Sequence, residues 1–193
     1  MAVRYELASI GAGNMAEGII AAVVAQGVYP REAIVVSDPV AERRELFASR
    51  FGVAVTDDNR KLVVESRRIM LAVKPQGFGD VATGVADLVR RDQLFISIMA
   101  GKSAAAIAAA LGSNTAKAES REGIPAGGGA GKDSRTSGDR TSVRVVRVMP
   151  NLPIKVGAGM AGIFGGEHAT AEDVADVQRM FNAGGGSVVV GDE

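Results

Sequence analysis

The sequence contains no cysteine and no tryptophan, and its only histidine is His168. Without cysteine, a disulfide framework, a thiolate nucleophile and a cysteine-ligated zinc or iron–sulfur site are all excluded. A single histidine also excludes a histidine-cluster metal site, and it leaves a Ser/His/Asp triad dependent on one residue near the end of the chain. We therefore predict no metal site.

Neither an excess of one charge nor a long apolar run is present. Lys plus Arg and Asp plus Glu each number 22, so the formal net charge is zero, and nothing in the composition favours nucleic acid or an anionic membrane as a partner. The longest charge-free stretches, residues 18–30 and 103–116, are shorter than the roughly 18 to 20 apolar residues that a membrane span needs. We expect no transmembrane helix, and a reducing, cytoplasmic location agrees with the lack of cysteine.

The chain has enough hydrophobic residues, 47% of 193, to form one packed domain. Apolar runs of strand length alternate with longer segments of helical period, which is typical of repeated βαβ units. The expected strands are residues 5–10, 33–37, 53–55, 68–73, 94–99, 143–149, 161–164 and 186–190. The expected helices are residues 14–25, 40–50, about 59–66, 79–91, 104–111 and a last one capped by Thr170. The pattern predicts an α/β, Rossmann-like, doubly wound, mainly parallel sheet with helices on both faces, in a single domain over residues 1–193.

Residues 114–142 interrupt this alternation. The segment is rich in Gly, Ser, Thr and charged residues, and Ile124 is its only large apolar side chain. Burial cannot offset the entropy of ordering such a segment, so we expect a disordered insertion. Its GGGAGKD sequence (127–133) is not interpreted as a phosphate-binding P-loop, because the spacing is one residue short, Asp133 replaces the Ser/Thr and no strand precedes it.

A glycine motif follows the first expected strand and opens the first expected helix. Gly11-Ala12-Gly13-Asn14-Met15-Ala16 fits the GxGxxG/A pattern of dinucleotide-binding turns. Gly11 permits the tight turn, Gly13 lets the backbone approach a pyrophosphate, and the small Ala16 lets the helix pack on the strand. The first backbone amides of the helix would then hold the phosphates.

Asp38 ends the second expected strand, where an acidic residue can accept hydrogen bonds from the ribose hydroxyls and repel a 2′-phosphate. That position favours NAD(H), although Asp38 could instead cap the next helix with Pro39 at its first position. Arg43 and Arg44 lie on that helix and could turn toward a 2′-phosphate or form a solvated helix face. The choice between NADH and NADPH therefore stays open.

Two further segments end strands at the same sheet edge, where open α/β sheets bind ligands. They are AVKPQ, at 72–76, and SIMAG, at 97–101. Taken alone, Lys74 would be a surface charge and Gly101 a turn glycine.

Four sequence segments together resemble the pyrroline-5-carboxylate reductase family. They are IGAGNMAE (10–17), LAVKPQ (71–76), ISIMAG (96–101) and VRVMPNLP (146–153). The last, followed by VGAGM (156–160), is the most specific, because MPN after a strand is uncommon among dinucleotide-binding domains. The resemblance extends over about residues 5–190, apart from the insertion.

The resemblance implies a domain that binds NADPH or NADH and presents the nicotinamide to a cyclic imine, 1-pyrroline-5-carboxylate, which is reduced to proline. The cofactor contacts that it implies fall on Ile10, Gly11, Ala12, Gly13, Asn14, Met15, Ser37, Asp38, Pro39, Asn59, Ala72, Val73, Lys74, Pro75, Ile98, Met99, Ala100, Pro150 and Asn151. The catalytic residues are left unassigned, since no titratable residue stands out as an acid or base for imine reduction. A full-length member of the family is expected to form a homo-oligomer.

The sequence also departs from the family pattern. Leu152 stands where the family has Thr, and Ala158 where an acidic residue is common. Family members continue into a helical domain that supplies the oligomer interface and most substrate contacts, whereas this sequence stops at Glu193. We therefore expect the 193 residues to bind the cofactor but to reduce pyrroline-5-carboxylate poorly.

Two alternatives were weighed against this interpretation. One is a related reductase, either F420-dependent NADP reductase-like or 3-hydroxyacid dehydrogenase-like, and the MPN segment disfavours it. The other is a non-catalytic dinucleotide-binding module. No catalytic role is expected for His168.

Overall fold

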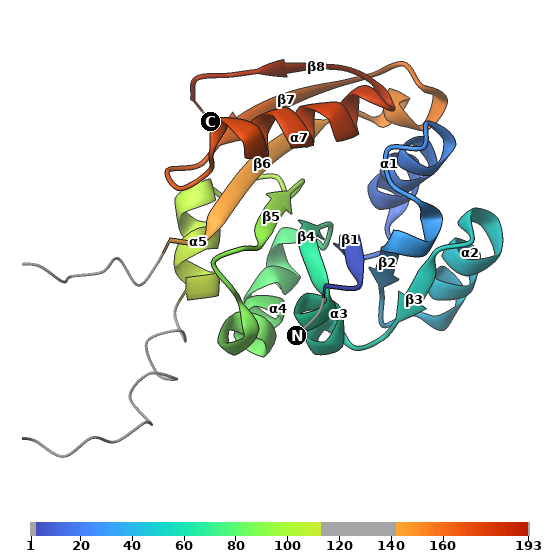
Figure 1. Cartoon of the computed structure of the whole chain (residues 1–193), viewed down its shortest axis with the longest axis horizontal. Coiled ribbons are helices and arrows are strands. Elements are labelled where there is room, and N and C mark those ends of the chain that lie inside the picture. Colours follow the sequence, from blue (N-terminus) through green and yellow to red (C-terminus); the bar gives the residue numbers. More distant parts are fainter. Residues whose placement is uncertain (1–2, 113–141, 193) are drawn as a thin grey trace, which may run out of the picture.

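The computed structural model describes residues 3–112 and 142–192 (Figure 1). The insertion expected at 114–142, with its GGGAGKD sequence, therefore lies outside the described residues except for Ser142. A single eight-stranded sheet forms the centre of the described part. Its strands are β1 (Tyr5–Ile10), β2 (Ile34–Ser37), β3 (Ala54–Thr56), β4 (Ser66–Leu71), β5 (Leu94–Ser97), β6 (Arg144–Pro150), β7 (Gly159–Gly165) and β8 (Gly185–Val189).

The strand order is β3-β2-β1-β4-β5-β6-β7-β8. All neighbouring strands are parallel except β6 and β7, which pair antiparallel with Met149 opposite Gly162. The order reverses between β1 and β4, so the crossovers to β2 and to β4 run in opposite directions along the sheet. The mainly parallel, doubly wound sheet predicted from the sequence is confirmed.

Helices cover both faces of the sheet. The α-helices are α1 (Asn14–Ala25), α2 (Ala41–Phe51), α3 (Asn59–Glu65), α4 (Phe78–Val85), α5 (Ala104–Gly112) and α7 (Ala171–Asn182). Short 3₁₀ segments are η1 (Arg31–Ala33), η2 (Pro75–Gly77), η3 (Ala86–Leu88) and η5 (Leu152–Val156). Buried residues of α1, α2 and α7 form one hydrophobic cluster, and those of α3, α4 and α5 form a second.

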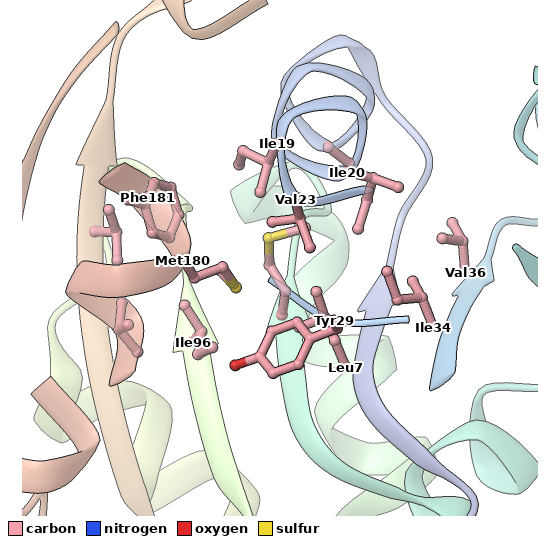
Figure 2. Packing of buried hydrophobic residues seen from close by; sticks show 14 of the residues in the cluster. Leu7, Ile19, Ile20, Val23, Tyr29, Ile34, Val36, Ile96, Met180 and Phe181 are labelled. Atoms are coloured by element: carbon pink, nitrogen blue, oxygen red, sulfur yellow. The ribbon is translucent and has the colours of Figure 1, made fainter. Parts of the chain in front are cut away.

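The two clusters follow from the alternation of side chains along each strand. In β2, Ile34 and Val36 face the α1 side, while Val35 faces the other cluster. In β5, Ile96 and Phe95 divide in the same way. Figure 2 shows the first cluster, in which α1 and α7 both pack side chains over the strands. Because both faces are covered, the central strands read as continuous apolar runs.

Local signals fix several helix ends. Asp58 caps α3 by accepting hydrogen bonds from the backbone N–H groups of Arg60 and Lys61. Thr170 and Asp173 form a reciprocal capping box at the start of α7. At the other end of α2, Gly52 adopts a left-handed conformation that favours glycine.

The helix expected at 79–91 is shorter in the structure, because α4 ends at Val85 and the 3₁₀ turn η3 follows. The chain then turns to bury Gln93, whose side-chain N–H₂ donates to the carbonyl oxygens of Val63 and Ser66 at 2.6 and 2.9 Å. A continuous helix would place these polar groups elsewhere, so tertiary hydrogen bonding ends it early.

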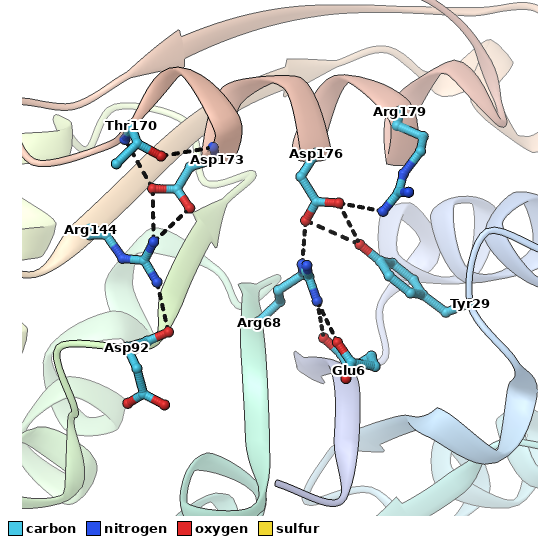
Figure 3. A network of polar contacts seen from close by, with 9 residues as sticks. All are labelled: Glu6, Tyr29, Arg68, Asp92, Arg144, Thr170, Asp173, Asp176 and Arg179. Atoms are coloured by element: carbon cyan, nitrogen blue, oxygen red, sulfur yellow. Dashed lines mark hydrogen bonds and ion pairs between the residues drawn. The ribbon is translucent and has the colours of Figure 1, made fainter.

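An ionic network joins α7 to the amino ends of the strands (Figure 3). Asp176 of α7 pairs with Arg68 of β4 and with Arg179, and Arg68 also pairs with Glu6 at 2.7 Å. The Tyr29 hydroxyl lies 3.4 Å from both carboxylate oxygens of Asp176, and burial raises the pKa of Tyr29. This network ties the first and second halves of the sheet together at the edge opposite the glycine motif.

Among residues 3–112 and 142–192, no helix is both long and apolar enough to cross a membrane.

Candidate functional site

The site predicted from the sequence lies at the carboxyl edge of the parallel strands. Successive backbone hydrogen bonds join the segments there: Gly11 N donates to the Ser37 carbonyl at 2.8 Å, Ala72 N to the Ile10 carbonyl at 2.9 Å, and Ile98 N to the Leu71 carbonyl at 3.2 Å. The ends of β1, β2, β4 and β5 are thus side by side. This edge, at the reversal of strand order, is where open α/β sheets bind ligands.

Gly11 makes the turn between β1 and α1 possible. Its φ is +105°, and a Cβ built on it would lie 2.6 Å from the Ala72 carbonyl oxygen. Both observations require glycine, because such a φ is strained for other residues and real Cβ atoms do not approach so closely. This geometry agrees with the role predicted for Gly11, which is to permit the tight turn.

Gly13 differs from Gly11, because the protein itself does not require glycine there. It has a φ of −73°, which any residue adopts, and among the described residues only its own chain neighbours have atoms within 4 Å of a Cβ built on it. Gly13 is the N-cap of α1 but provides no side-chain cap, so the first amides of α1 lack the partner that Asp58 gives α3 and Thr170 gives α7. Uncapped amides beside an open glycine surface fit a phosphate group.

Asp38 uses its carboxylate to hold the glycine turn. Oδ2 accepts from the Ala12 N–H at 2.8 Å, and Oδ1 accepts from the Val40 N–H at 2.9 Å. The helix-capping alternative with Pro39 at the first helical position is wrong, because α2 begins at Ala41 and Val40 is its N-cap. Asp38 remains beside the turn, and an ionised carboxylate has further lone pairs for a ribose hydroxyl.

The predicted residues Ser37 and Asn59 are brought together. The Ser37 hydroxyl donates to the Asn59 side-chain oxygen at 2.6 Å, although they come from β2 and α3. Asn59, the first residue of α3, therefore lies at the end of β2, where Asp38 and Pro39 follow Ser37.

The two arginines of α2 are committed to protein partners. Arg43 Nε donates to the Ala12 carbonyl at 2.7 Å, and its Nη2 to Glu17 at 2.9 Å. Arg44 Nη1 donates to the carbonyl oxygens of Asp38 and Pro39 at 2.7 and 2.9 Å. The solvated helix face considered from the sequence is therefore wrong for both.

Glu17 was not anticipated from the sequence as part of this site. Hydrogen bonding from Arg43 is the main cause that lowers the pKa of Glu17, with Lys155 and Arg50 adding to it against the opposing effect of burial. A signal was present, because Arg43 and Arg50 are seven residues apart and so lie on one face of α2, opposite an acidic residue in the first turn of α1.

Close packing places the MPN segment near α1. A Cβ on Gly18 would lie 2.8 Å from the Lys155 side chain, and one on Gly184 would lie 2.3 Å from the Ile154 side chain. These two glycines let η5 approach α1 closely. Pro150 ends β6, which runs parallel to β5, so Pro150 and Asn151 lie at the same sheet edge as the glycine turn. Asn151 Oδ1 accepts from Met160 N at 2.9 Å, which fixes the side chain to β7.

The remaining predicted residues end β4 and β5 at this edge. Arg147 of β6, which the sequence analysis did not single out, donates to the Met99 carbonyl at 3.1 Å. Lys74 and Ala100 are exposed, and Met99 is buried. The structure thus brings the following predicted residues to one edge: Ile10 to Met15, Ser37 to Pro39, Asn59, Ala72 to Pro75, Ile98 to Ala100, Pro150 and Asn151.

Two hollows lie away from the glycine turn and differ from it in the residues that line them. One, of about 540 Å³, lies under α7 and is lined by Arg68, Arg144, Asp173 and Asp176, whose charges pair with one another. The other, of about 370 Å³, lies beside α5 and includes His168. Because β7 runs antiparallel to β6, His168 after β7 is at the edge opposite the glycine turn. Over the described ranges no cluster of three or more His, Asp or Glu side chains could hold a metal ion.

Comparisons with known proteins show what the chain is similar to. A family model described as NADP oxidoreductase coenzyme F420-dependent matches residues 6–101. The chain is 34% identical to a pyrroline-5-carboxylate reductase of Haemophilus influenzae, over 97% of this chain and 58% of the relative. It is 30% identical to that of Pseudomonas aeruginosa, over 97% of this chain and 58% of the relative. The chain is thus similar to pyrroline-5-carboxylate reductases over almost its whole length, and to the F420-type model over residues 6–101.

Solved structures show the same similarity. A pyrroline-5-carboxylate reductase from Coxiella burnetii superimposes with a TM-score of 0.78 at 26% identity, covering 98% of this chain and 60% of that chain. A Plasmodium falciparum pyrroline carboxylate reductase with NADP bound has a TM-score of 0.73 at 18% identity, covering 98% of this chain and 59% of that chain, which bears on the fold alone. The chain thus spans less than two thirds of the length of these pyrroline-5-carboxylate reductases. The F420-type model ends at residue 101, before the MPN segment, whereas the pyrroline-5-carboxylate reductases match across it.

Proposed function

We propose that this chain is the cofactor-binding part of an NAD(P)H-dependent reductase that converts 1-pyrroline-5-carboxylate to proline. The observation that carries the proposal is the open, uncapped start of α1 at Gly13, in a chain related over almost its whole length to pyrroline-5-carboxylate reductases. The pyrophosphate of a dinucleotide fits this site, because it needs hydrogen-bond donors and positive potential and the start of a helix supplies both.

In the proposed complex, the amides at the start of α1 bind the pyrophosphate and Asp38 lies at the adenosine ribose. The segments 72–75, 98–100 and 150–151 flank the nicotinamide. NADH or NADPH, when bound, supplies the hydride that adds to the carbon of the C=N bond, and the protein residues orient the ring and limit access of water. No catalytic residue is assigned among the described side chains.

A coenzyme titration combined with a turnover assay tests the proposal. We expect NADH or NADPH to bind the 193-residue chain with a micromolar dissociation constant, and slow oxidation when pyrroline-5-carboxylate is added. The reason is that orienting the two reactants can contribute roughly 7 to 11 kcal/mol, and the chain spans 58% of its relatives' length. Binding without any turnover would favour the alternative of a non-catalytic dinucleotide-binding module. Absence of binding to either coenzyme would refute the proposal.

We further propose that the chain self-associates, in line with the homo-oligomer expected for the full-length family. Exposed large apolar side chains gather between residues 149 and 190: Met149, Leu152, Val156, Met160, Val188, Val189 and Val190. β8 is also an edge strand, which offers unpaired backbone groups. A concentration-independent monomer by size-exclusion chromatography would contradict this. A cytoplasmic location, expected from the lack of cysteine, is part of the same proposal.

A further inference from the structure

Both polar ends of the peptide groups around Ala12 are held by side chains. The Gly11 carbonyl accepts from the Ser9 hydroxyl at 2.8 Å, and the Ala12 N–H of the same peptide group donates to Asp38. In the next peptide group, the Ala12 carbonyl accepts from Arg43 Nε at 2.7 Å. The turn is therefore fixed by hydrogen bonds to side chains from β1, the end of β2 and α2.

The bond from Arg43 determines where the Gly13 N–H points. In a planar trans peptide group, the carbonyl oxygen and the following N–H point in opposite directions. Since the Ala12 carbonyl points toward Arg43 on α2, the Gly13 N–H must point away from α2. Within residues 3–112 and 142–192, this N–H has no protein acceptor. It lies next to the uncapped amides of α1, where the proposed pyrophosphate binds.

Arg43 is itself held in place. Its Nη2 pairs with Glu17 Oε2 at 2.9 Å, and its guanidinium lies 5.7 Å from the centre of the Phe47 ring. The side chain of Glu17 is only 15% exposed, and that of Arg43 is 28% exposed. A charged hydrogen bond with partial burial is stronger and more directional than a solvated one. The guanidinium is thus oriented before any ligand arrives.

We propose that Arg43 is a positioning residue for coenzyme binding: it holds the Ala12 carbonyl and thereby aims the Gly13 N–H at the pyrophosphate. This inference rests on the proposed function, and it deepens it by assigning a role to a side chain that does not touch the coenzyme. It also replaces the role considered from the sequence, in which Arg43 would bind a 2′-phosphate.

The two roles predict different patterns of affinity. A positioning residue acts on the pyrophosphate, which NADH and NADPH share, so its loss weakens both coenzymes equally. A 2′-phosphate ligand acts on NADPH alone. The ratio of the two dissociation constants therefore separates the roles.

The test compares Arg43→Met with Arg50→Met in the full 193-residue chain. Methionine keeps much of the aliphatic length and removes the guanidinium. Arg50 is the matched control, because it lies on the same helix and pairs with Glu17 at 2.9 Å but does not contact the turn. Dissociation constants for NADH and for NADPH are measured by titration. Amide hydrogen exchange at Ala12, whose N–H donates to Asp38, is measured by NMR without coenzyme.

We expect Arg43→Met to weaken NADH and NADPH about 10-fold each and to speed exchange at the Ala12 amide, with exchange in α7 unchanged. Arg50→Met should stay within about twofold for both coenzymes. Should Arg43→Met fail to fold, Glu17→Gln provides a milder second variant, with an expected two- to fourfold loss for both coenzymes. Loss of NADPH binding alone, or unchanged affinities and exchange, would overturn the inference while leaving the proposed function intact. A wild-type chain that binds neither coenzyme would instead overturn the proposed function, and this inference with it.

Discussion

Replacing Gly11 and Gly13 by alanine, one at a time, separates the folding role of the glycine motif from its binding role. At Gly11, a side chain must adopt a φ of +105° and place Cβ 2.6 Å from the Ala72 carbonyl oxygen. Such backbone strain costs about 1–3 kcal/mol, and relieving the overlap costs about 1–3 kcal/mol more. We therefore expect Gly11→Ala to lower the free energy of unfolding by about 2–6 kcal/mol.

At Gly13 the same substitution should leave the fold almost unchanged. The φ of −73° suits alanine, and among the described residues only the chain neighbours of Gly13 have atoms within 4 Å of the added Cβ. Alanine is a poorer N-cap than glycine, but it also lowers the entropy of the unfolded chain by about 0.4–1 kcal/mol, so the net change should stay within about 1 kcal/mol. The new methyl group stands beside the amides that we assign to the pyrophosphate. We expect coenzyme affinity to fall about 10- to 100-fold, or about 1.4–2.8 kcal/mol.

Urea unfolding followed by circular dichroism gives the stabilities, and NADH fluorescence gives the affinities. The chain has no tryptophan, so protein emission interferes little with the coenzyme signal. The reasoning fails if Gly13→Ala binds NADH and NADPH as tightly as the wild-type chain. It also fails if Gly13→Ala is destabilised as strongly as Gly11→Ala, because the folded chain would then have no room for a methyl group at Gly13.

Three other predictions follow from the same contacts. Asp38→Asn removes a negative charge beside the ribose and keeps one acceptor oxygen. In paired titrations, the affinity for NADPH relative to NADH should therefore rise about 5- to 20-fold. An unchanged ratio would place the ribose elsewhere. Asp176→Ala leaves the largely buried Arg68 without its main partner and should lower the free energy of unfolding in urea by about 2–4 kcal/mol. Asp87→Ala, in the exposed pair with Arg60, should lower it much less, and equal losses would contradict the argument from burial. Glu17 has a folded-state pKa below its ordinary 4.5, so its contribution to stability is complete above that pH and is lost as the pH falls through the lowered pKa. Glu17→Gln should make the free energy of unfolding fall less steeply with decreasing pH. Parallel plots of this free energy against pH for the two proteins, between pH 6 and 3, would refute the lowered pKa.

The β1–turn–α1 unit was predictable from the sequence because its signals are local. The apolar run of β1, the glycines and the period of α1 fall within one continuous segment, and the structure places α1 at Asn14–Ala25, as the pattern predicts. The strand expected at 68–73 is less accurate, since β4 runs from Ser66 to Leu71. Ala72 and Val73 are apolar but leave the ladder at the point where the Ala72 carbonyl packs against Gly11. The hydrophobic pattern of the sequence does not show at which residue a strand stops pairing with its neighbours.

The contacts that orient the turn could not be predicted, because each joins distant segments. Asp38 accepts from Ala12, and Arg43 donates to the same residue, only because β2 lies beside β1 and α2 packs beside α1. From the sequence, the acidic residue and the arginine suggested contacts with the coenzyme itself. Both bond to the backbone of the glycine turn, a role that no sequence spacing indicates.

This arrangement has a consequence for how mutations at the site should be interpreted. The groups that we assign to the pyrophosphate are backbone amides, which only a substitution by proline removes. Side chains therefore influence that part of the coenzyme through the orientation of the turn or, at Gly13, by filling the space beside the amides. Arg43 should therefore change the affinities for NADH and NADPH by the same factor. Asp38 has two roles, since it bonds to Ala12 and lies beside the ribose, so its substitution should change both the common affinity and the ratio. Measuring the two coenzymes together thus distinguishes a residue that orients the turn from one that discriminates the ribose, even where both variants simply bind less well.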